Sequence, residues 1–161
     1  MGKELLIEIP VAIIGTTGFT ILFGVSKRHY LTCGLNGAFS WLIYRIALNF
    51  ALSPPVATFI AAFALTTMSR ILSVRSKAPT TIFLYGGILT LVPGTGIYAI
   101  AYKLFLGYAL EGFMTATDTL KTAIAIGLGI GVAYMIPPHI FGWGKYSQIP
   151  EDASVSERNI L

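Results

Sequence analysis

Residues 79–106 form an apolar stretch long enough to cross a membrane, yet its middle reads Pro93-Gly94-Thr95-Gly96. Proline removes a backbone donor and clashes with the preceding helical turn, and glycine has little helix preference. In hydrocarbon, the freed backbone groups must be covered by protein or by a water-filled cavity. Transporters use broken helices to bring helix ends and bare backbone groups to a substrate near mid-membrane. The break therefore favours a solute transporter, and a simple proline kink satisfied by neighbouring helices is the alternative.

The composition of the chain indicates a membrane protein. Of its 161 residues, 55% are hydrophobic and 11% are charged, whereas a soluble domain is about 25% charged. The net charge of +4 is small and lies between apolar runs. It therefore indicates membrane topology and not affinity for nucleic acid. We expect an all-α integral membrane protein in contact with the lipid bilayer.

Five apolar segments can be drawn along the chain. They are residues 5–24, 30–50, 54–72, 80–106 and 118–135, and the fourth is broken at Pro93-Gly94. A spanning helix needs about 20 residues for a hydrocarbon core roughly 30 Å thick. The third and fifth segments are slightly short but can span with tilt or snorkelling side chains. The sequence thus predicts a transmembrane helical domain over residues 1–141 and a polar cytoplasmic tail over residues 142–161.

The basic residues are unevenly distributed if all five segments cross the membrane. One side receives seven, namely Lys27, Arg28, Arg70, Arg75, Lys77, Lys145 and Arg158. The other side receives three, namely Lys3, Lys103 and Lys121. Because basic loops stay in the cytoplasm, we expect the N-terminus outside and the C-terminus in the cytoplasm.

The break itself is the first candidate binding site. Residues 80–92 would give about 20 Å of helix, more than half of the hydrocarbon core. A second half-helix could restart at Ile97 with Thr95 as its N-cap. Its first amide groups and positive dipole end would then face the gap, where a carboxylate would suit. Pro93, Gly94, Thr95 and Gly96 are therefore candidate substrate-binding residues.

Polar residues also gather in the second segment. An arginine within a span is a functional candidate, but Arg45 lies about five residues from the segment end, close enough to snorkel. Asn36 lies nine residues earlier and points to another face, where bonding to a neighbouring helix is the simpler explanation. Both residues are candidate substrate contacts with a structural alternative.

Three further patterns have structural explanations. Glu8 could exchange protons within the membrane, but a place at the outer interface explains it better. Asp118 and Lys121 are three residues apart and predict an intrahelical pair. The glycines within residues 127–131 lie in an apolar run without a preceding strand. They predict close helix packing rather than a nucleotide-binding loop.

No arrangement typical of an enzyme can be argued from the sequence. The two histidines, His29 and His139, lie at segment ends. No Ser-His-Asp set, pair of carboxylates or metal-ligand cluster is visible. We therefore expect no catalytic site, metal or other cofactor.

Several short segments together carry a specific resemblance. They are Phe23-Gly24-Val25-Ser26-Lys27-Arg28, Cys33-Gly34-Leu35-Asn36-Gly37, Val56-Ala57-Thr58-Phe59, Lys77-Ala78-Pro79-Thr80-Thr81-Ile82-Phe83, Leu91-Val92-Pro93-Gly94 with Tyr98, and Thr119-Leu120-Lys121. In them the chain resembles the bacterial threonine/serine exporter family, in the short form that corresponds to the C-terminal membrane half of full-length exporters. The resemblance covers residues 19 to about 141 and adds Tyr98 to the candidate site. Two of three family prolines before the break are absent, because residues 86–94 read Gly-Gly-Ile-Leu-Thr-Leu-Val-Pro-Gly.

The resemblance implies a function and a partner. It implies a membrane subunit of a proton-coupled secondary transporter in a bacterial inner (plasma) membrane, exporting small carboxylate-bearing metabolites, above all threonine and serine. It also implies a larger partner subunit resembling the N-terminal half of the exporters, with a homo-oligomer as the other form of assembly. The alternatives are a subunit of a dicarboxylate (succinate-like) exporter, or a non-transporting membrane module that stabilises or regulates a partner.

Overall fold

The computed structural model describes residues 2–137, and for residues 2–4 it describes the backbone alone. This part of the chain is entirely helical, which confirms the predicted all-α fold. Its elements are α1 (Gly2–Leu22), the short 3-10 helix η1 (Lys27–His29), α2 (Tyr30–Asn49), α3 (Pro54–Ser76), α4 (Thr80–Leu91), α5 (Gly94–Phe105) and α6 (Ala109–Met135). The predicted tail over residues 142–161 lies outside the described residues.

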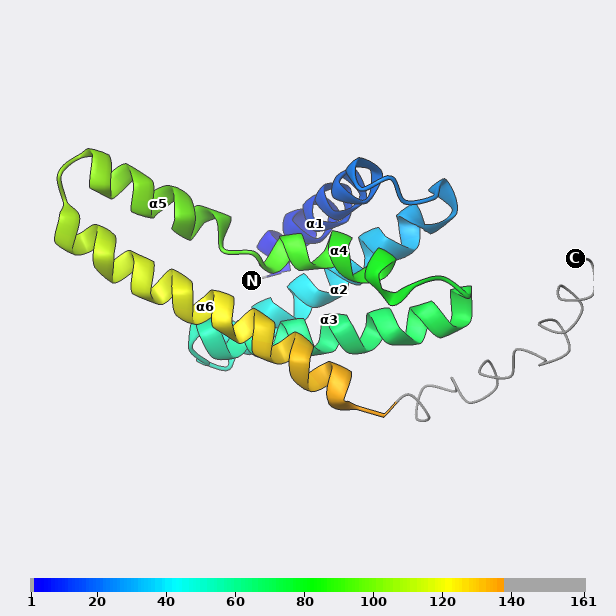
Figure 1. Cartoon of the computed structure of the whole chain (residues 1–161). Coiled ribbons are helices and arrows are strands. Elements are labelled where there is room, and N and C mark those ends of the chain that lie inside the picture. Colours follow the sequence, from blue (N-terminus) through cyan, green and yellow to red (C-terminus); the bar gives the residue numbers. More distant parts are fainter. Residues whose placement is uncertain (1, 138–161) are drawn as a thin grey trace, which may run out of the picture.

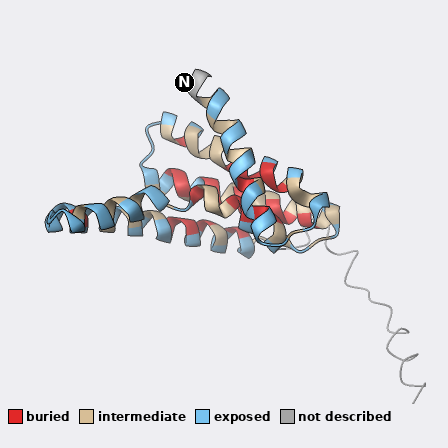
Figure 2. Cartoon of the chain, turned by 90° about the horizontal axis from the view of Figure 1, so that it is seen from above, coloured by how far each residue is buried: buried red, intermediate tan, exposed pale blue. Residues whose placement is uncertain are grey.

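Helices α1 to α4 form a bundle with α2 at its centre, in contact with α1, α3 and α4. Helix α6 packs along α3 and pairs with α5 as a hairpin that extends away from the bundle (Figure 1). Buried residues gather in the bundle, whereas most of the hairpin is exposed (Figure 2). The broken helix therefore joins the bundle, which contains most of the buried residues, to the largely exposed hairpin.

Small residues allow the bundle helices to approach closely. The buried apolar cluster consists of Ala61, Ala62, Leu65, Leu84, Leu91 and Ile126. A Cβ atom on Gly37 of α2 would collide with Thr16 of α1, and one on Gly129 of α6 would lie 2.6 Å from the carbonyl oxygen of Phe59. Such contacts are typical of helix packing in membranes, where close van der Waals contact replaces the hydrophobic driving force.

Large apolar side chains lie on the outside of the molecule. Phe105 and Met135 are 91% and 83% exposed, and Leu6, Ile14 and Leu31 are also exposed. An exposed apolar surface of this extent marks contact with lipid or protein. Together with the long apolar helices, it identifies a multi-pass membrane protein.

The structure supports at least three membrane spans. α1 from residue 5, α3 and α6 are long and apolar enough to cross, and the bent pair of α4 and α5 makes up to four. α2 is long enough to cross, with 20 residues. It is not among the candidate spans, because polar side chains such as Asn36, Arg45 and Asn49 lower its mean hydropathy. A total of five spans remains a prediction.

The sequence predicted that the last helix begins at Asp118, but α6 begins at Ala109. Gly107, with φ +84°, forms the turn between α5 and α6 in a conformation that suits glycine. Lys103 of α5 then lies 3.7 Å from the carboxylate of Glu111, which stands in the first turn of α6. The helix therefore includes the stretch before Asp118, which had been taken to lie outside it.

Arg70 lies inside α3, which continues beyond the predicted end near Leu72 to Ser76. Its side chain is buried, and Nη1 donates a 2.6 Å hydrogen bond to the carbonyl oxygen of Ala133 near the end of α6. The guanidinium also lies over the ring of Tyr134. A cation suits this place, because carbonyl groups in the last turn lack partners within their own helix.

Candidate functional site

Helices α4 and α5 meet at Pro93-Gly94 with a bend of 42°, which confirms the predicted break. The predicted restart at Ile97 with a Thr95 cap was wrong. α5 begins at Gly94, with Pro93 at the N-cap position and no capping side chain. The fixed φ of proline suits a helix start, and Ile97 N–H donates to the Pro93 carbonyl at 3.1 Å. The amides of Thr95 and Gly96 are left in the first turn, where no acceptor exists within the helix.

A cavity of about 330 Å³ opens beside the break, between α2, α3, α4, α5 and α6. Six threonines line this break cavity, namely Thr58, Thr90, Thr95, Thr115, Thr119 and Thr122, together with Asp118 and the rings of Trp41 and Tyr44. Its volume is at the lower end of the range of about 300–1,000 Å³ for small-molecule sites. The cavity therefore suits a small polar metabolite.

Most of the hydroxyl groups around the break cavity use their proton within their own helix. Thr58 donates to the carbonyl of Pro54, and Thr90 to that of Gly87. On α6 the hydroxyl groups of Thr115, Thr119 and Thr122 each donate to the carbonyl four residues earlier, at 2.8, 2.7 and 3.0 Å. A hydroxyl group has one proton and two acceptor lone pairs. These side chains therefore offer chiefly acceptors to a bound molecule.

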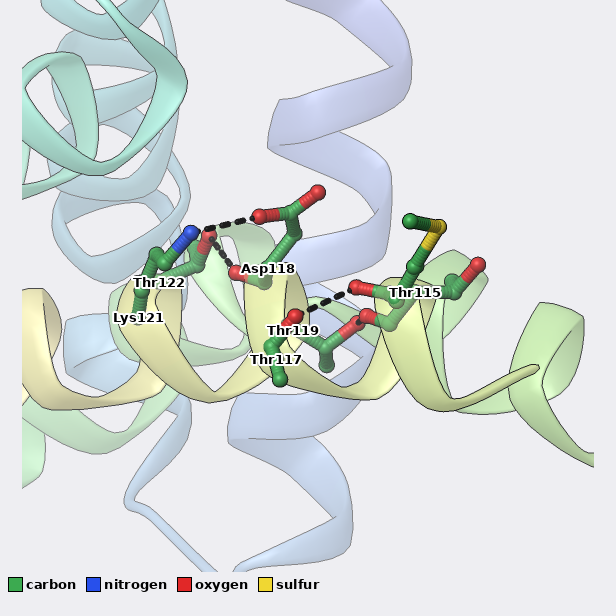
Figure 3. A network of polar contacts seen from close by, with 7 residues as sticks. Thr115, Thr117, Asp118, Thr119, Lys121 and Thr122 are labelled. Atoms are coloured by element: carbon green, nitrogen blue, oxygen red, sulfur yellow. Dashed lines mark hydrogen bonds and ion pairs between the residues drawn. The ribbon is translucent and has the colours of Figure 1, made fainter. Parts of the chain in front are cut away.

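The predicted pair of Asp118 and Lys121 is confirmed on α6, with Nζ 2.9 Å from Oδ1 (Figure 3). The two side chains are 74% and 64% exposed. They lie about 14 Å and 18 Å from the start of a helix about 40 Å long, close to its middle. Asp118 lines the break cavity, and both residues line a second cavity of about 410 Å³ beside Ser53, Pro54 and Pro55.

Three of the predicted site residues line the break cavity, namely Pro93, Thr95 and Gly96. Gly94 lies at the break but is exposed, and a Cβ atom there would meet no atom within 4 Å. Tyr98 is 70% exposed and stacks on Tyr102 with ring centroids 6.1 Å apart. The structure thus brings the centre of the predicted motif to the cavity and places Gly94 and Tyr98 beside it.

Asn36 lies at the centre of the bundle, outside the break cavity. Its side-chain amide donates to Ser69 Oγ at 2.9 Å and to the carbonyl of Phe83 at 3.2 Å. It therefore links α2 to α3 and α4, as the structural alternative expected. Its own carbonyl oxygen accepts no hydrogen bond within the described part of the chain.

Arg45 forms an ion pair with Glu8 that the sequence did not suggest. Arg45 Nε lies 2.9 Å from Glu8 Oε2, and Trp41 Nε1 donates to the same oxygen at 3.1 Å. Glu8 lies near the start of α1 and Arg45 near the end of α2, so the two meet because the helices are antiparallel. Trp41 also lines the break cavity. Its side chain therefore contacts both Glu8 of the ion pair and the cavity.

The cavity wall on α6 was missed by the sequence reasoning. Thr115, Asp118, Thr119 and Thr122 recur at spacings of three or four residues, which places them on one helical face. This spacing was the available signal, but it was hidden when the helix was taken to begin at Asp118. For metal binding, residues 2–137 contain no group of three or more His, Cys, Asp or Glu side chains that could hold an ion.

The long apolar helices, one of them broken beside a polar cavity, define a multi-pass helical membrane protein. The chain belongs to the family described as "Threonine/Serine exporter, ThrE", which matches residues 8–136. It is 24% identical over 152 residues to a "Probable threonine/serine exporter" of Mycobacterium tuberculosis (strain ATCC 25618 / H37Rv). The match covers 92% of this chain but 28% of the relative, so the chain spans less than a third of the relative's length. No solved structure matches the chain.

Proposed function

We propose that this chain is the membrane subunit of a proton-coupled secondary transporter that exports small amino acids such as threonine and serine. It acts in a bacterial plasma membrane, with its N-terminus outside and its C-terminus in the cytoplasm. Membership in an exporter family supports the reaction class. The observation that carries the proposal is the break cavity, because a broken helix beside a polar cavity is a common substrate site in transporters.

The proposed substrate site includes Pro93, Thr95 and Gly96 on the cavity wall. Gly94 and Tyr98 lie at its margin, and Asn36 and Arg45 support it from the bundle. The first-turn amides of α5 carry the positive end of the helix dipole. A carboxylate that entered the cavity would accept hydrogen bonds from them.

A larger partner subunit is part of the proposal. The relative contains more than three times the length that this chain matches. The charged pair of Asp118 and Lys121 is exposed near the middle of α6. Direct contact of these charged groups with lipid would be energetically unfavourable. We infer that a second protein, corresponding to the additional length of the relative, completes the enclosure of the cavity.

The test is efflux from the native host after deletion of this chain. Cells are loaded with labelled threonine or serine, and efflux is compared between the deletion strain, the wild-type complement and an empty vector. This design retains any partner. A Gly131→Ala complement is the matched control, because Gly131 lies outside the cavity and a Cβ atom there meets no atom within 4 Å.

Deletion should slow efflux severalfold, and the wild-type and Gly131→Ala chains should restore it equally. Efflux that is the same with and without the chain would contradict an exporter and would favour a non-transporting membrane module.

A further inference from the structure

We propose that Asp118 binds the ammonium group of the exported molecule and thereby makes the site selective for amino acids over dicarboxylates. This inference rests on the proposed function and assigns a role to one residue of the same cavity. Asp118 is the one carboxylate among the described residues that line the break cavity, and no lysine or arginine in the described part of the chain lines it.

The hydrogen-bonding capacity of the cavity wall points to a ligand that donates. On α6 the hydroxyl protons of Thr115, Thr119 and Thr122 are used by backbone carbonyls. Thr115 Oγ1 also accepts a hydrogen bond from Lys103 Nζ at 3.0 Å, so Thr119 and Thr122 are the two hydroxyl groups that present lone pairs beside the Asp118 carboxylate. An ammonium group has three donors and no acceptor. It would donate to Asp118 and to these hydroxyl oxygens, whereas a carboxylate could not donate to them and would be repelled by the like charge of Asp118.

The part of the cavity wall that α5 contributes, next to α6, has the complementary character. The amide groups of Thr95 and Gly96 lie in the first turn of α5 and have no hydrogen-bond acceptor within that helix. A zwitterion could therefore place its carboxylate at α5 and its ammonium group at α6. The second carboxylate of a dicarboxylate would instead lie against Asp118, without an arginine or lysine of the cavity wall to receive it.

Lys121 holds Asp118 in place while leaving it accessible. The Lys121 ammonium contacts one oxygen of Asp118 at 2.9 Å, and a carboxylate has two oxygens with about four acceptor sites. Lys121 itself lines the second cavity and not the break cavity. A ligand can therefore bind Asp118 without displacing Lys121.

The experiment compares L-serine with glycerate, in which a hydroxyl group replaces the ammonium group, and with succinate. Efflux of each labelled probe is measured in the deletion strain complemented with wild type, Asp118→Asn, Asp118→Glu or Lys121→Gln at matched membrane levels. Asp118→Ser is used if Asp118→Asn does not accumulate. Asp118→Asn retains the size of the side chain and removes its charge, whereas Lys121→Gln breaks the same ion pair and leaves the carboxylate.

We expect Asp118→Asn to lower serine efflux at least tenfold while glycerate efflux is unchanged or higher. Asp118→Glu and Lys121→Gln should keep the preference for serine over glycerate and succinate. The inference is overturned if Asp118→Asn keeps the wild-type preference, or if Asp118→Asn and Lys121→Gln lower all efflux alike, as a purely structural pair would. If deletion itself leaves serine efflux unchanged, the proposed function fails and this inference falls with it.

Discussion

Gly96 determines how closely α5 can lie against α6 at the break. A Cβ atom on Gly96 would lie 2.5 Å from Thr119 Oγ1 and 3.2 Å from its methyl carbon. Two residues earlier, a Cβ atom on Gly94 would meet nothing within 4 Å. The two glycines of one motif therefore have different roles, since only Gly96 is required by a close approach.

We predict that Gly96→Ala destabilises the protein by about 1–3 kcal/mol, the usual cost of overpacking a close contact. Gly94→Ala should change stability by less than about 0.5 kcal/mol, as expected for an open site. Thermal unfolding in detergent measures both. Adding Thr119→Ala to Gly96→Ala removes the two nearest atoms and should restore most of the loss; no recovery in the double variant would show that another contact is responsible.

Residue patterns predicted some contacts and missed others for a physical reason. Asp118 and Lys121 share one helix, so their spacing was sufficient to predict the pair. Glu8 and Arg45 are 37 positions apart, and only the antiparallel packing of α1 and α2 brings them together. The buried place of Arg70 was missed for the same reason, because its partner lies on α6.

Helices α3 and α6 make the most extensive contact between two elements of the described structure. A Cβ atom on Gly129 would lie 2.6 Å from the carbonyl oxygen of Phe59 and 3.0 Å from the Cβ atom of Ala62. The neighbouring glycines at positions 127 and 131 have open space around them. The sequence pattern predicted that all three glycines serve helix packing. Only Gly129 lies on the face of α6 that contacts α3.

We predict that Gly129→Ala separates α3 from α6 and lowers the apparent Tm, since the opposing atoms belong to the backbone and cannot move aside. Gly131→Ala should leave the Tm unchanged or raise it slightly, because alanine favours a helix over glycine by about 1 kcal/mol. Thermal unfolding of the two matched variants gives the comparison. Equal loss in both would argue against close α3–α6 packing.

At the level of elements, the sequence predicted the break and the starts of α2, α3 and α4 correctly. Prolines fix the start of α3 and the break, because they restrict φ and remove donors locally. The starts of α5 and α6 could not be predicted in the same way. They depend on the Gly107 turn and on contacts between the two helices of the hairpin.

For the molecule as a whole, the predicted orientation depends on which end of the bundle the basic residues occupy. Lys3, Arg70, Arg75, Lys103 and Lys121 all lie within helices, and positions 145 and 158 are outside the described residues, so the split of seven basic residues against three stays a prediction. The turns that precede α2 and α4, which contain Lys27, Arg28 and Lys77, lie at the same end of the bundle (Figure 1). Basic residues at one end are expected to stay in the cytoplasm.

We predict that a cysteine placed at position 4 is labelled by an impermeant reagent from outside, and that one at position 147 is spared. The measurement uses a Cys33→Ser background, because Cys33 is the one cysteine of the chain. Labelling of both positions from the same side would rule out an odd number of spans.

The central claim is that the break cavity is the substrate site, and substrate protection of a cavity cysteine tests it most directly. In the Cys33→Ser background, Thr95→Cys places a thiol on the cavity wall, and Ser53→Cys places a control thiol in the neighbouring cavity outside it. Alkylation rates are measured in native-host membranes with and without threonine or serine. Substrate should slow alkylation of Thr95→Cys severalfold and leave that of Ser53→Cys unchanged. Equal rates with and without substrate at Thr95→Cys, in membranes that retain efflux, would contradict the central claim.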